Sequence, residues 1–227
     1  MFKKIGIILA DDMEFKAFYN YAKNYDVEEI ERKGQKFLKI DDGKHEIYAV
    51  ESGVGKVNAA ISAIELILNF DVEAILNAGY SGAVSGLSKG DVVAGTRYVE
   101  CDFDFTALDY NLGEKPDGKL FTYPNKELLD VALTLEGMKS GNLGCGDVFL
   151  ADTERKNFFK KTFEINAFDM ESGALGVACE KYGVPFLSIR KISDNADDTA
   201  KEEYREENNL CKEDLAKILL EIVAKLQ

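Results

Sequence analysis

Short, strongly apolar segments alternate with amphipathic ones along the chain, and this alternation constrains the fold more than any single motif. The clearest apolar runs are residues 4–10, 72–78 and 184–189. Apolar runs of this length are typical of strands that are buried on both faces, as in a parallel sheet. Residues 57–67 and 212–226 instead repeat their apolar positions with a helical period. We therefore predict an α/β fold: a single three-layer domain over residues 1–227, with a mixed central sheet flanked by helices on both faces.

Composition and charge narrow the function classes. The 227 residues are 46% hydrophobic, and 41 acidic against 28 basic side chains give a formal net charge of −13. An acidic surface of this kind argues against nucleic acid or an anionic membrane as a partner. No apolar stretch approaches the length of a transmembrane helix. The charge says nothing about a small neutral or zwitterionic ligand.

The cysteine and histidine content gives no sign of a metal site or of disulfides. Cys101, Cys145, Cys179 and Cys211 are widely spaced without a Cys-x-x-Cys pair, and His45 is the single histidine. A structural zinc site normally needs closely spaced cysteine and histidine ligands. We expect no metal and no cofactor. Because no signal peptide precedes the first strand, we also expect a reducing cytoplasm.

Turn residues and periodicity predict the remaining elements. Residues 35–40 and 46–51 alternate in polarity around Asp42-Gly43, which is typical of a hairpin. Residues 163–168 have the pattern of a strand, and residues 79–83 have that of a glycine-rich turn. Residues 101–119 show no sustained period and predict a long surface loop, a kind of segment that is usually functional or mobile. Gly183 is expected to end the helix over residues 173–182.

Acidic residues follow several of the predicted strands. Glu14 follows the first strand, Glu171 follows residues 163–168, and Asp194 follows residues 184–189. Ligands of open α/β sheets bind outside the carboxyl ends of the strands, where a partly buried carboxylate can hold or release a proton. Two structural alternatives remain open. Asp194 could cap a helix or begin a turn with Asn195, and Glu14 could serve only the dipole of the first helix.

Two glycine-rich segments follow strands. The first is Ser52-Gly-Val-Gly-Lys56, which lacks the spacer of a Walker loop and the third glycine of a dinucleotide fingerprint. We interpret it as a strand-to-helix turn that brings backbone close to a ligand. The second segment, residues 79–83, contains Tyr80, Ser81 and Gly82, which we expect to line the same ligand.

The order and spacing of these motifs resemble the nucleoside phosphorylase and nucleosidase superfamily, and specifically the 5′-methylthioadenosine/S-adenosylhomocysteine nucleosidases. The likeness covers nearly the whole chain, and each of its pieces is short. The pieces are Lys4-Ile-Gly-Ile-Ile with Glu14, Ser52-Gly-Val-Gly-Lys-Val57, Asn77-Ala-Gly79 with Gly82, Gly90-Asp-Val-Val93, Gly146-Asp-Val-Phe149, Met170-Glu171 and Arg190-Lys-Ile-Ser-Asp194.

The resemblance implies a nucleoside phosphorylase-like fold and roles for the three carboxylates. Cleavage of a ribose–adenine bond needs an acid at the purine and a base near C1′. Asp194, helped by Ser193, would protonate adenine N7, and Glu14 would take a proton from the attacking water. Glu171 would bind the ribose hydroxyls and stabilise the oxocarbenium-like transition state.

The resemblance also implies a set of substrate contacts. Phe149 would stack on adenine, the backbone of Leu150 would contact the base edge, and Met170 would pack against the sugar. Arg190 would orient the acidic cluster. From the residue pattern alone, ordinary core packing would be the better interpretation of Phe149 and Met170. A homodimer is also implied, in which Phe105 and Leu108 of the long loop reach the neighbouring subunit's site.

Four positions depart from the pattern of this family. Leu9-Ala10-Asp11 stands where Gly-Ala-Met is usual, Tyr80 replaces a small residue, and Asp169 replaces a glutamate. Tyr204 takes the place of a phenylalanine that covers the 5′-alkylthio group. Asp11 and Tyr204 would make the pocket for the 5′ substituent more polar than a methylthio group needs. Val54 would be the apolar residue that is left in this pocket. We therefore expect weak discrimination in favour of methylthioadenosine.

Three functions remain to be compared: a nucleosidase that uses water, a phosphorylase that uses phosphate, and a binding protein without catalysis. No arginine lies in the first loop near Glu14 or just before the second glycine-rich segment. A carboxylate about 4 Å from a phosphate charge would cost about 4 kcal/mol at an effective dielectric constant near 20. The absence of arginine therefore favours water over phosphate as the nucleophile. A binding protein would need neither an acid nor a base, so the presence of both favours an enzyme, and hydrolysis is the favoured function.

Overall fold

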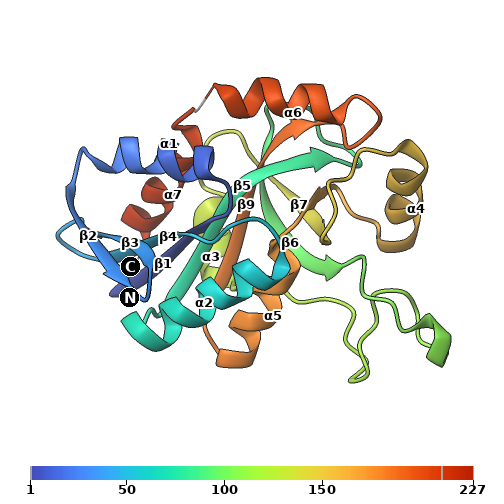
Figure 1. Cartoon of the computed structure of the whole chain (residues 1–227), viewed down its shortest axis with the longest axis horizontal. Coiled ribbons are helices and arrows are strands. Elements are labelled where there is room, and N and C mark those ends of the chain that lie inside the picture. Colours follow the sequence, from blue (N-terminus) through green and yellow to red (C-terminus); the bar gives the residue numbers. More distant parts are fainter. Residues whose placement is uncertain (1, 211, 227) are drawn as a thin grey trace.

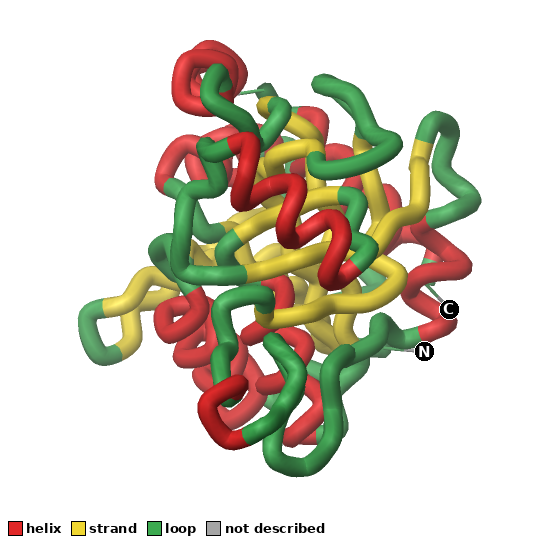
Figure 2. The backbone as a smooth tube through the Cα atoms, turned by 90° about the vertical axis from the view of Figure 1, so that its right-hand side faces the viewer, coloured by secondary structure: helices red, strands yellow, loops and turns green. Residues whose placement is uncertain are grey.

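The computed structural model describes residues 2–210 and 212–226, in which nine strands form one mixed sheet. Helices cover both faces of this sheet (Figures 1 and 2). The strands are β1 (Lys4–Leu9), β2 (Asp26–Arg32), β3 (Gln35–Asp41), β4 (Glu46–Glu51), β5 (Ala74–Ala83), β6 (Val92–Glu100), β7 (Met138–Cys145), β8 (Ala167–Asp169) and β9 (Phe186–Asp194). The helices are α1 (Asp12–Ala22), α2 (Lys56–Phe70), the short 3₁₀ helix η1 (Thr106–Leu108), α3 (Lys126–Ala132), α4 (Thr153–Phe163), α5 (Ser172–Tyr182), α6 (Ala200–Asn209) and α7 (Asp214–Lys225).

The sheet partly closes on itself. Its strand order is β2-β3-β4-β1-β5-β8-β7-β6-β9, and β9 also pairs with β5. The strands β5, β8, β7, β6 and β9 therefore form a closed ring, while β2, β3, β4 and β1 extend from it. β1 is parallel to β4 and β5, and β6 is antiparallel to β9, so the sheet is mixed as predicted. The ring itself was not expected, because closure depends on pairings between distant segments. It leaves β5 and β9 without a free edge.

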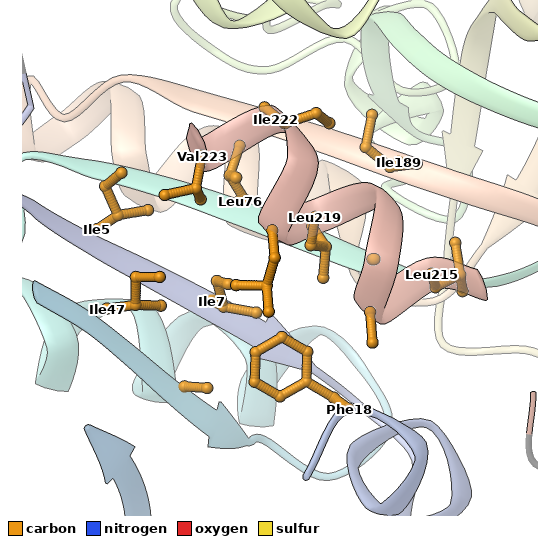
Figure 3. Close-up of a cluster of buried hydrophobic side chains, with 14 of the residues drawn as sticks. Ile5, Ile7, Phe18, Ile47, Leu76, Ile189, Leu215, Leu219, Ile222 and Val223 are labelled. Carbon is orange, nitrogen blue, oxygen red and sulfur yellow. The ribbon is translucent and has the colours of Figure 1, made fainter. Parts of the chain in front are cut away.

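Two apolar cores lie on opposite faces of the sheet. Helices α1, α3 and α7 pack on one face, and α2 and α5 pack on the other. Figure 3 shows the first core, where α7 places Leu215, Leu219 and Ile222 against side chains of the central strands. Phe18 of α1 closes the side of this core. The prediction of a three-layer α/β domain with helices on both faces is confirmed.

The hairpin at residues 35–51 is present, and a second hairpin precedes it. β3 pairs antiparallel with β4 as predicted, and β2 pairs antiparallel with β3. β2 was missed because its seven residues are mostly charged and exposed, so they show no buried face. The turn between β2 and β3 is Lys33-Gly34, with φ values of 51° and 83°. Two positive φ values match the type I′ turn that suits a two-residue hairpin.

Two strands run further than predicted. Residues 79–83 are not a turn but the second half of β5, and β9 continues past Ile189 to Asp194. The glycines of β5 mark close packing: a Cβ on Gly79 would lie 2.7 Å from Arg190 Nη1, and one on Gly82 would lie 2.7 Å from the Cβ of Ala196. Glycine therefore permits close approach here instead of turning the chain.

The predicted strand over residues 163–168 is mostly wrong. Phe163 is the last residue of α4, Glu164 caps that helix with φ 53°, and the strand begins only at Ala167. The apolar pattern arose because Phe163 and Ile165 are buried in a third cluster with Phe168. Gly183 ends α5 with φ 68°, as predicted.

The long segment after β6 is irregular apart from η1, as predicted, and Leu108 in it is exposed. Cys101, Cys145 and Cys179 are free and buried, whereas Cys211 lies outside the described residues. Within the described ranges, no helix combines the length and apolar character needed to cross a membrane.

Candidate active site

A pocket of about 290 Å³ opens where β1, β8 and β9 end, beside the last residues of β5. Of the residues predicted to form the site, all but Arg190 line this pocket. The lining residues are Ala10, Asp11, Glu14, Val54, Tyr80, Ser81, Gly82, Val148, Phe149, Leu150, Phe168, Asp169, Met170, Glu171, Ser193, Asp194 and Tyr204. The fold thus brings Glu14, Glu171 and Asp194 from three distant segments to one cavity.

Glu14 is held by backbone amides. It is the third residue of α1, and its side chain forms a capping box with Asp11. Its carboxylate accepts hydrogen bonds from the amides of Ala10 and Asp11, both at 3.2 Å, and of Tyr80 at 2.8 Å. Burial nevertheless raises the pKa of Glu14 to about 7, with a further contribution from the charge of Glu171. The cap role is therefore real, but the same carboxylate faces the pocket.

Arg190 lies behind the pocket and not on its wall. It is 1% exposed, and its guanidinium is 3.3 Å from Asp169 Oδ1 and 3.3 Å from Glu171 Oε2. It also donates to Asn77 Oδ1 at 2.6 Å and to Ser188 Oγ at 3.1 Å. With its donors directed at protein groups, Arg190 acts through the carboxylates, which corrects its placement among the substrate-contacting residues.

Glu171 receives one further hydrogen bond from the first glycine-rich turn. The amide of Gly55 donates to Glu171 Oε1 at 3.1 Å, and Gly55 has φ 100°, a conformation that suits glycine. Burial raises the pKa of Glu171, against the opposing charge of Arg190. The turn thus brings backbone to a carboxylate of the protein itself.

The lysine of this turn does not face the pocket. Lys56 Nζ lies 2.8 Å from Asp102 Oδ1 and 3.3 Å from Glu100 Oε1, and its amide donates to Asp147 Oδ1 at 2.8 Å. These carboxylates fix the turn and neutralise the lysine, in keeping with the rejection of a Walker loop. The contact of Asp147 with this turn was not predicted, because a single aspartate after a glycine is typical of an ordinary turn.

A β-bulge in β9 sets the direction of the Asp194 side chain. Ser81 pairs with Ile192 and Gly82 with Asp194, so Ser193 is an extra residue on β9. Asp194 Oδ2 accepts from Ser193 Oγ at 2.6 Å and Oδ1 accepts from the amide of Ala196 at 2.8 Å. The expected turn is therefore present, but α6 begins only after Thr199, so Asp194 caps no helix. Burial raises the pKa of Asp194.

Aromatic side chains form the outer wall. Phe149 is 44% exposed and faces Tyr204 edge-on, with ring centroids 5.5 Å apart. Tyr80 meets the same tyrosine edge-on at 6.3 Å. Phe149 is thus not a core residue, and its ring is accessible to a ligand. Leu150 is buried in the wall, while Met170 is partly exposed.

The chain matches the model of the phosphorylase superfamily over residues 4–224. It belongs to this superfamily. The 5′-methylthioadenosine/S-adenosylhomocysteine nucleosidase of Halalkalibacterium halodurans is 34% identical over 98% of this chain and 99% of its own. The aminodeoxyfutalosine nucleosidase of Helicobacter pylori strain J99 is 33% identical over 87% of this chain and 88% of its own.

The fold also matches that of a solved nucleosidase structure. The crystal structure of Helicobacter pylori 5′-methylthioadenosine/S-adenosylhomocysteine nucleosidase has a TM-score of 0.94 and 31% identity, and 99% of each chain is covered. The resemblance seen in the sequence motifs is therefore confirmed at the level of family and fold.

Replacing Glu14 with Gln should remove a pH dependence of stability. The rise of the Glu14 pKa from 4.5 to about 7 means that the folded state prefers the neutral form, by about 3 kcal/mol. This preference contributes to stability below pH 4.5 and is lost as the pH rises through 7. Urea unfolding at pH 4 and at pH 8.5 should therefore show that wild type loses about 3 kcal/mol of stability relative to the variant between these two pH values.

Glu154→Gln provides the control, because Glu154 lies in the first turn of α4 and is exposed. It should not change stability measurably at either pH. A stability difference between Glu14→Gln and wild type that is the same at both pH values would show that Glu14 is not held in a desolvated site.

Proposed function

We propose that this protein hydrolyses the N-glycosidic bond of an adenine nucleoside and releases adenine. The observation that carries the proposal is the meeting of Glu14, Glu171 and Asp194 in one pocket, all with pKa values raised by burial. The relatives described above are nucleosidases, which supports the same chemistry.

Asp194 is the proposed general acid at the base. Burial raises its pKa, so it takes up a proton more readily than a free aspartate, and the protonated carboxyl group would donate to N7 of adenine and make the departing base neutral. The hydroxyl of Ser193 and the amide of Ala196 fix the carboxyl group. The exposed ring of Phe149 offers a face for stacking, and the backbone of Leu150 lies at the pocket wall.

Glu14 and Glu171 are the proposed groups at the sugar. Glu171 would accept hydrogen bonds from the ribose hydroxyls and stabilise positive charge on the ring, with Met170 packed against the sugar. Glu14 would take a proton from the attacking water. With a pKa of about 7, it is ionised in a large fraction of molecules at neutral pH and still basic enough to act.

Water is preferred to phosphate as the nucleophile because of the charge of the pocket. No lysine or arginine is found among the pocket-lining residues in the described part of the chain. A phosphate dianion would therefore meet carboxylates without a cation, since the guanidinium of Arg190 faces Asp169 and Glu171. We propose hydrolysis and not phosphorolysis.

Asp194→Asn should reduce kcat for adenine release by about a hundredfold or more, because it keeps the shape of the acid and removes its proton. The measurement is adenine release from adenosine and methylthioadenosine without phosphate. Asp198→Asn makes the same change at an exposed position four residues on and should behave as wild type. Near-normal turnover of Asp194→Asn would exclude Asp194 as the acid.

We further propose that the protein is a cytoplasmic homodimer that acts in methionine salvage. The dimer is inferred from the exposed apolar face of α2. Val57, Ile61 and Leu68 repeat along one side of this helix and are 67%, 50% and 60% exposed. A contiguous exposed apolar face is typical of a protein interface. Val54 at the start of this face also lines the pocket, so a partner bound here would border the site. Leu108, 63% exposed, is the proposed contact from the long loop.

Sedimentation equilibrium at micromolar concentration should show a wild-type dimer. Ile61→Glu places a charge in the apolar face and should shift the protein toward monomer by at least tenfold in dissociation constant. Leu133→Glu, which changes an exposed leucine at the end of α3, should leave the dimer intact. A wild-type monomer at these concentrations would contradict the assembly proposal.

A further inference from the structure

We propose that the pocket selects adenine nucleosides whose 5′ substituent donates a hydrogen bond, a hydroxyl or an ammonium group, in preference to a thioether. The inference rests on the proposed function and names its substrate class. It is carried by a polar cluster of Asp11, Tyr204 and Asn208, which joins the start of α1 to α6 at the pocket. Asp11 and Tyr204 line the cavity itself.

The carboxylate of Asp11 caps α1, where its side chain accepts hydrogen bonds from the amides of Met13 and Glu14, and only its contacts with α6 are weak. Its Oδ1 accepts a good hydrogen bond from the amide of Met13 at 2.9 Å and a long one from Asn208 Nδ2 at 3.3 Å. Its Oδ2 accepts from the Tyr204 hydroxyl at 3.4 Å, which is near the limit for such a bond. One carboxylate oxygen in the pocket therefore retains capacity for a stronger donor.

Asn208 joins Asp11 to Tyr204 without lining the pocket itself. Its Nδ2 donates to Asp11 and, at 3.2 Å, to the hydroxyl of Tyr204. Its Oδ1 is buried and has no hydrogen-bond partner in the protein. Because Asn208 does not line the pocket, its effect on a ligand is to hold Asp11 and Tyr204 in position.

The cluster is held in place by a buried lysine. Lys191 Nζ lies 2.7 Å from Glu207 Oε1 and 2.6 Å from Asp214 Oδ2, which ties α6 and α7 to β9. Glu207 immediately precedes Asn208 and lies almost one turn after Tyr204. Side chains fixed before the ligand binds discriminate between ligands better than mobile ones.

Elimination points to the 5′ substituent as the partner of this cluster. In the proposed function, Asp194 binds the base and Glu171 binds the ribose hydroxyls. Glu14 binds the attacking water. Asp169, the other lining carboxylate, is occupied by Arg190 and by the hydroxyl and amide of Ser172. Asp11 remains, three residues before Glu14, and the 5′ substituent is the part of the nucleoside that remains without a polar partner.

A thioether would leave this cluster unsatisfied. A methylthio group has no donor, and its binding would exclude water from Asp11 without replacing the lost hydrogen bonds. A 5′-hydroxyl can donate to Asp11, and a 5′-ammonium adds a charge attraction. An anionic 5′ group would be repelled. Loss of one such hydrogen bond corresponds to about tenfold to a hundredfold in kcat/KM.

The test compares kcat/KM for four nucleosides: adenosine, 5′-amino-5′-deoxyadenosine, 5′-deoxyadenosine and methylthioadenosine. The first two should exceed 5′-deoxyadenosine by at least about tenfold, and methylthioadenosine should not be preferred to adenosine. Preference for 5′-deoxyadenosine or methylthioadenosine over adenosine would overturn the inference and leave the nucleosidase proposal standing. No adenine release from any of the four would overturn both.

Variants locate the effect. Asp11→Asn keeps a good helix cap and removes the charge, and it should lower the preference for the 5′-amino over the 5′-deoxy nucleoside by at least tenfold. Tyr204→Phe, which removes only the hydroxyl, should lower the preference for adenosine over methylthioadenosine. Asp12→Asn removes an equal charge from the exposed neighbour and should leave both ratios unchanged. Unchanged ratios in both Asp11→Asn and Tyr204→Phe would overturn the assignment.

Discussion

The site depends on one buried guanidinium. Arg190 is enclosed between β5, β8 and β9, where it pairs with Asp169 and Glu171 and donates to Asn77 and Ser188. Two carboxylates could not remain charged in this interior without a cation, because desolvation would force them to take up protons. Arg190 thereby makes an acidic pocket possible and ties β5, β8 and β9 together beside it. Gly79 is required beside it, since any side chain there would collide with the guanidinium.

One arginine does not balance the negative charge that the fold collects around it. Asp169, Glu171 and Glu14 all lie within its influence, and the charge of Glu171 adds to the effect of burial on Glu14. Burial raises the pKa of Glu14 to about 7, and the charge of Glu171 adds to the rise, despite three backbone amides that favour the ionised form. Holding this carboxylate ionised therefore costs stability above pH 7. Chemistry and stability therefore oppose each other at Glu14.

The sequence predicted those features of the fold and the site that depend on short local segments. The apolar run before Asp194 predicted a buried strand, and the order of short motifs predicted the family. The ring of β5, β8, β7, β6 and β9 could not be foreseen, because it depends on pairings between distant strands. β2 carries its charges on both faces and so lacks a periodic signal. Asn208 lies in a strongly charged helical stretch, where nothing marks one polar residue as a partner of Asp11 and Tyr204.

The dependence of kcat/KM on pH tests the central claim most directly. If Glu14 is the base and is held in a desolvated site, kcat/KM for adenosine should fall about tenfold per pH unit below a single ionisation near pH 7. A profile that stays flat from pH 8 down to pH 5 would contradict the account, since it would mean that no carboxyl group with a raised pKa has to be ionised for the reaction.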